Sequence, residues 1–176
     1  MAVNPEATWI STFASAMGPV ADTSWAAALA AWAGTEADLM ELTSITGATF
    51  TFNLAVFTAQ LLSLVSPNPA QTPALLTFAT AWEAAVLAST MVVAGGSGFG
   101  FSAIVGTGVA SNSSAAKLIL AAALVGPPTD DITASAFPPA FRTGFLALVY
   151  LVTGSGVPPT APFPPIAPFV GSSGTQ

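Results

Sequence analysis

Long stretches without a charged residue constrain the fold of this chain most strongly. Neither the 41 residues of 42–82 nor the 33 residues of 84–116 contain an Asp, Glu, Lys or Arg. Prolines and glycines divide much of this sequence into short apolar segments, such as 53–65 and 140–153. A helix that spans a bilayer needs about 20 apolar residues. The pattern therefore predicts short helices that pack against one another.

Only the segment 73–94 is long enough to span a bilayer. Thr72 is placed to cap it and Pro73 suits its first turn, but Glu83 lies at its midpoint. Burial of a lone carboxylate costs several kcal/mol. Since the chain has only two cationic residues, we expect Glu83 and Arg142 to form a structural ion pair.

The N-terminal part, residues 1–45, contains the clearest helix signals. Trp25, Leu29 and Trp32 follow the capping residues of 22–24 at helical spacing, and Gly34 is a stop signal. A second short helix is expected over 36–43. The alternation of Thr and Phe over 49–52 is a weak strand signal.

The central part contains an internal resemblance. Leu-Val-Ser-Pro at 64–67 recurs as Leu-Val-Gly-Pro at 124–127, and similar spacings of aromatic residues follow each copy. Two pseudo-repeated αα-hairpins, hairpin one in 46–94 and hairpin two in 114–153, would explain it. Chance similarity between Ala-rich helices is the alternative. The glycine-rich segment 95–113 is then a flexible or tightly turning connector between the hairpins; the alternative is a hairpin of its own with Phe99, Phe101 and Val105 on one face.

The C-terminal part, residues 154–176, is read as an extended Pro-rich arm. Six of the fifteen prolines lie in 157–170, a composition that favours polyproline II with three residues per turn. Phe163, Ile166 and Phe169 would then share one edge and dock into a groove of a partner. The alternative is that the segment folds back over its own core. The predicted fold is accordingly a mostly α bundle of short helices, with a single helical domain at 1–153 and this arm.

Composition excludes several classes of function. The chain has no Cys and no His, which removes disulfides, imidazole catalysis and nearly all zinc, copper and haem sites. Two cationic residues cannot neutralise a nucleic-acid backbone. We expect no cofactor, no metal, no nucleic-acid partner and no secretory signal peptide, because no positive residue precedes Lys117.

One motif with a catalytic precedent occurs. Ser114 and Lys117 match Ser-x-x-Lys, in which a lysine one turn away activates a serine nucleophile. The motif has no accompanying partner motif, and the run Ser-Asn-Ser-Ser at 111–114 is explained more simply as a helix cap. We therefore expect that the protein is not an enzyme.

The shortage of charge indicates the function. Charged residues make up 6% of the chain, whereas a soluble domain carries roughly 25%. We therefore expect a structural subunit of a large assembly, such as a virion, tail, shell or filament, that packs against copies of itself or other proteins and is particle-associated. Asn53 and Gln60 form an uncharged polar stripe suited to a neighbour. The alternative is a membrane-embedded helical protein, which segment length and proline placement oppose.

Overall fold

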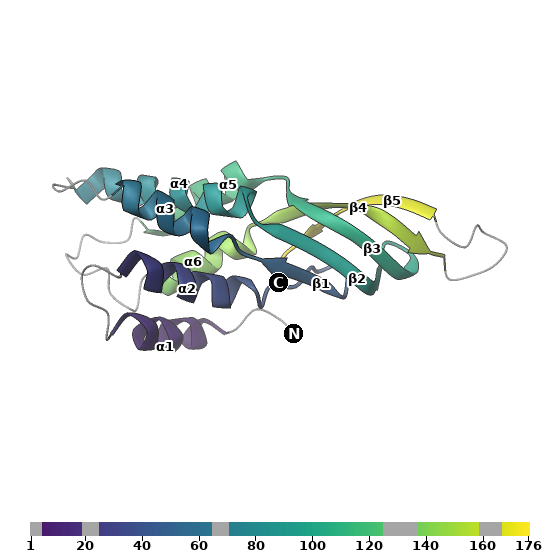
Figure 1. The fold of residues 1–176 in the computed structure, drawn as a ribbon, viewed down its shortest axis with the longest axis horizontal. Helices are drawn as coiled ribbons and strands as arrows, with labels where there is room; N and C mark the ends of the chain where they lie inside the picture. Colours follow the sequence, from purple (N-terminus) through teal and green to yellow (C-terminus); the bar gives the residue numbers. More distant parts are fainter. Residues whose placement is uncertain (1–4, 19–24, 65–70, 125–136, 159–166) are drawn as a thin grey trace.

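Six helices and five strands make up the described part of the chain. The computed structural model describes residues 5–18, 25–64, 71–124, 137–158 and 167–176. The helices are α1 Glu6–Met17, α2 Trp25–Ala37, α3 Leu54–Leu64, α4 Gln71–Leu87, α5 Ser113–Leu124 and α6 Phe137–Leu146. The strands are β1 Ala48–Thr51, β2 Thr90–Gly98, β3 Phe101–Ala110, β4 Val149–Val157 and β5 Ala167–Gly174. The helices gather at one end of an elongated molecule, and the sheet extends to the other end (Figure 1).

The helices pack as a closed ring. Each helix contacts the next one along the chain, and α1 also contacts α6. The ring lies at one end of the molecule, and the sheet extends away from it rather than lying beneath the helices (Figure 1).

The sheet is antiparallel throughout and follows the chain order β1-β2-β3-β4-β5. Residues 41–46, which precede β1, connect the two edges of the sheet. Glu41 and Gln176 exchange backbone hydrogen bonds of 3.2 and 2.9 Å just after β5, and the Thr46 N–H donates to the Ser97 oxygen on β2 (2.9 Å). This connection curls the sheet, so that one face is turned inward and the other outward.

Three successive blocks of the chain share one order of elements. In the second block α3, α4, β2 and β3 follow one another, and in the third block α5, α6, β4 and β5 do so. Helices α3 and α5 begin 59 residues apart, and so do strands β2 and β4. A shorter version, α1, α2, residues 41–46 and β1, comes first. The internal resemblance in the sequence thus extends beyond the helix pairs into the sheet.

Aromatic side chains fill the space between the helix ring and the sheet. Phe145 of α6 is fully buried and lies near the rings of Trp9, Phe52, Trp82 and Phe141, with centroid distances of 5.4–6.0 Å. These rings come from all three blocks. The core therefore joins the blocks into one structure.

The predicted mostly α bundle is wrong, because the chain forms an α/β fold with a five-stranded sheet. The expected connector 95–113 belongs largely to the hairpin of β2 and β3, in line with the alternative given for it, and the expected arm supplies β5. The apolar segment 140–153 is split between α6 and β4 rather than forming one helix.

Glycine was the reason for the error. Glycine is uncommon in strands, so a run of glycines suggested a flexible connector. In the structure a Cβ atom on Gly96 would collide with the carbonyl oxygen of Thr46, and one on Gly154 would collide with that of Val105. The glycines therefore let neighbouring backbones pass closely within the curled sheet.

The turn between β2 and β3 contains a strained residue. Phe99 and Gly100 have φ angles of 48° and 82°, as in the two-residue turn that usually takes Asn-Gly. The Phe99 ring compensates for the unfavourable backbone, because it lies 5.7 Å from the ring of Phe169 and against Gly171 on β5. The hairpin tip is thereby fixed to the other end of the sheet.

Candidate functional site

The outward face of the sheet is the most distinctive surface of the described chain. Side chains alternate along each strand, so that Met91, Val93, Ile104, Tyr150 and Val152 point inward and are at most 2% exposed. The alternate positions point outward. We call them the outer sheet face, which comprises Thr49, Thr51, Thr90, Val92, Ala94, Ala103, Val105, Thr107, Val109, Leu151, Thr153, Ser155, Val157, Pro168, Val170 and Ser172.

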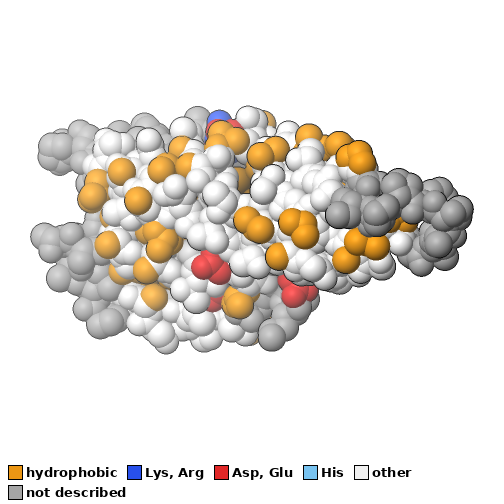
Figure 2. Space-filling view, turned by 45° about the vertical axis from the view of Figure 1, so that its right-hand side comes forward, with side chains coloured by type: hydrophobic (Ala, Val, Ile, Leu, Met, Phe, Trp, Pro, Cys, Tyr) orange, Lys and Arg blue, Asp and Glu red, His pale blue; other side chains and the backbone are white. Residues whose placement is uncertain are grey.

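No member of the outer sheet face is charged. The strand register places its members in rows across the sheet, such as Val92, Thr107, Thr153 and Val170. Val105, Val109 and Val170 are 62%, 63% and 71% exposed. In Figure 2 apolar side chains (orange) are scattered over the sheet among white atoms, which belong to the backbone and to side chains that are neither apolar nor charged.

Threonine and valine have nearly the same shape, and each carries a methyl group on a branched Cβ. Rows of such residues form a regular surface that another protein surface can approach closely. Burial of a hydroxyl group costs far less than burial of a charge. The outer sheet face is therefore chemically suited to being covered.

Charge is scarce on the whole described surface. Seven charged residues lie in the described ranges, and only Glu6 and Asp38 among them are exposed. Glu36, at 1% exposure, accepts a hydrogen bond of 2.6 Å from the Thr12 hydroxyl between α1 and α2. The described exterior thus carries even less charge than the composition suggests.

The Glu83 carboxylate is held by residues of α5. The Lys117 Nζ lies 2.6 Å from Glu83 Oε2, and the Ser114 hydroxyl donates to Glu83 Oε1 over 2.7 Å. Burial acts to raise the pKa of Glu83, but the hydrogen bonds from Lys117 and Ser114 outweigh it, so the pKa lies below its ordinary value. The structure therefore gives Glu83 a different cation from the expected Arg142, which is partly buried on α6.

This cluster also accounts for the Ser-x-x-Lys motif. Both of its polar side chains are engaged by the same carboxylate, and the interaction ties α4 of the second block to α5 of the third. We assign the motif a structural part in joining these blocks.

The expected partner-binding residues lie in different places. Phe169 is 7% exposed and packs against Phe99 and Phe101 inside the molecule. Asn53 caps α3, because its Oδ1 accepts from the Val56 N–H (3.0 Å) and its Nδ2 donates to the Ala88 oxygen (3.2 Å). Gln60 is partly exposed on α3, while Phe163 and Ile166 lie outside the described residues. Of the three residues that the structure describes, Asn53, Gln60 and Phe169, none belongs to the outer sheet face.

The outer sheet face was not predicted from the sequence. The signal was Thr, Val or Leu at every second position, at 90 and 92, at 105, 107 and 109, and at 149, 151 and 153, which has the period of a half-buried strand. It was obscured because glycines occupy several of the inward positions.

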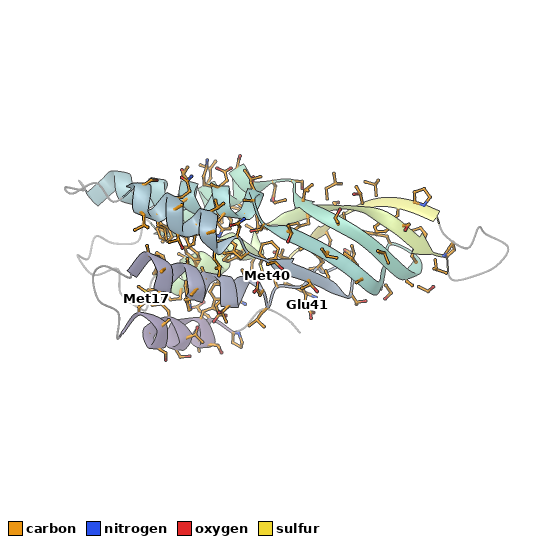
Figure 3. The ribbon with its side chains drawn as sticks, viewed as in Figure 1. Met17, Met40 and Glu41 are labelled. Carbon is orange, nitrogen blue, oxygen red and sulfur yellow. The ribbon has the colours of Figure 1, made fainter. Side chains whose placement is uncertain are left out.

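Figure 3 shows the described side chains on the ribbon, where they are crowded among the helices and sparser along the sheet. Between α2 and α3 lies a shallow groove lined by small and apolar residues, with a volume of about 570 Å³.

The described residues contain no group of three or more metal-ligating side chains. Within those same ranges, no helix has both the length and the apolar character needed to cross a membrane.

Comparisons with known proteins add no relative: no family model, curated protein or solved structure matches the chain.

Proposed function

We propose that the protein is a structural subunit of a large assembly and acts by packing its uncharged exterior against other protein chains. The observation that carries this proposal is the outer sheet face, a broad surface with valines up to 71% exposed and no charged residue. Virions, tails, shells and filaments are assemblies in which such a subunit would serve.

The size of the face supports the proposal. Five strands about 4.8 Å apart and about eight residues long, at about 3.3 Å per residue, present roughly 600 Å² in total, spread around the outside of the curled sheet. A mixed Val and Thr surface of this extent, together with exposed Leu62 and Leu87 on the helices, is best explained by a covering partner.

The test is the size of the native particle in buffer without detergent. We expect the purified chain to form large, uniform particles by light scattering and sedimentation. Val105→Lys combined with Val170→Lys should reduce their size, because each new charge would be buried without a partner. Ala14→Lys, which adds a charge to an exposed position of α1, is the matched control and should leave the particles intact.

Two results would contradict the proposal. The first is a dispersed monomer at high concentration, with or without other proteins of its source present. The second is a chain that leaves the cell membrane only with detergent, which would support a lipid environment instead.

A further inference from the structure

We draw no further inference here: the strongest candidate, the shallow groove between α2 and α3 that small and apolar side chains such as Ala31, Ala59 and Leu62 line, carries nothing, because nothing in the described part of the structure shows what covers it.

Discussion

Phe145 gives the most direct test of the packing that holds the fold together. Its ring is fully buried and lies near four other rings, those of Trp9, Phe52, Trp82 and Phe141. The neighbours belong to all three blocks, so they cannot move into the vacated space without shifting the helix ring against the sheet. We therefore expect Phe145→Ala to leave most of the cavity unfilled.

The expected magnitude follows from this burial. Truncation of a buried Phe to Ala costs about 3–5 kcal/mol, and the rigid aromatic surroundings place this site near 4 kcal/mol, with roughly 5–15 kcal/mol as the usual total stability. In a chain of this length each kcal/mol lowers the Tm by about 2–4 °C. The variant should melt roughly 8–16 °C below the wild type.

The measurement is urea and thermal unfolding followed by circular dichroism at one protein concentration. Leu118→Ala is the control, because Leu118 is 62% exposed on α5 and its truncation should change the free energy of unfolding by no more than about 0.5 kcal/mol. A loss below about 1 kcal/mol for Phe145→Ala, or one equal to that of the control, would refute the central position given to this ring.

Four further predictions follow from contacts within and between the blocks. Lys117→Met should lower the free energy of unfolding by about 1–2 kcal/mol, because it leaves the partly buried Glu83 without its cation. Since the folded-state pKa of Glu83 is lowered, the carboxylate stabilises the fold above its ordinary pKa, and this contribution is lost as the pH falls through the lowered value. Glu83→Gln should accordingly show a smaller decline in urea midpoint between about pH 5 and pH 3 than the wild type, and an equal decline would contradict this account. Gly154→Val should cost at least about 2 kcal/mol, because its Cβ would meet the backbone of β3; normal stability in a urea titration would show that the strands do not pass so closely. Asn112→Ala should cost about 2 kcal/mol, since Asn112 Oδ1 accepts from the Val149 N–H (2.7 Å) and its Nδ2 donates to the Ala147 oxygen (2.8 Å). Asn112→Asp keeps the acceptor and should recover part of the loss, and hydrogen exchange at Val149 would report whether that bond persists.

Short helices could be predicted because local signals mark them. The expected helix at 53–65 matches α3 to within one residue at each end, since Asn53 is a capping residue and the sequence continues with Ser-Pro-Asn-Pro at 66–69, a combination that disfavours a helix. The strand signal at 49–52 likewise corresponds to β1. Capping residues, prolines and alternation act over a few residues, so they can be read without knowledge of the fold.

The helix expected over 36–43 shows the limit of such signals. Gly34 suggested the end of the preceding helix, but α2 continues to Ala37. Gly34 is buried against Leu54 of α3, so it serves the close packing of two helices rather than a stop. A glycine in a sequence does not reveal which of these two purposes it has.

The cation that faces Glu83 could not be predicted either. Arg142 was expected because the chain has only two cationic residues, whereas Lys117 is brought to Glu83 by the packing of α5 on α4. The choice between two cations depends on which helices are neighbours in the ring, and the ring is closed by contacts between residues far apart in the chain.

The sequence by itself determined that this protein has very few charged groups, that it cannot use thiol or imidazole chemistry, and that its apolar segments are short. Composition and local order suffice for these conclusions. Only the tertiary structure decided that the glycine-rich segments are strands and that one face of the sheet turns outward with no charge on it. Strand pairing joins residues distant in sequence, and the need for glycine arises only where two backbones meet, so no local pattern contains that information.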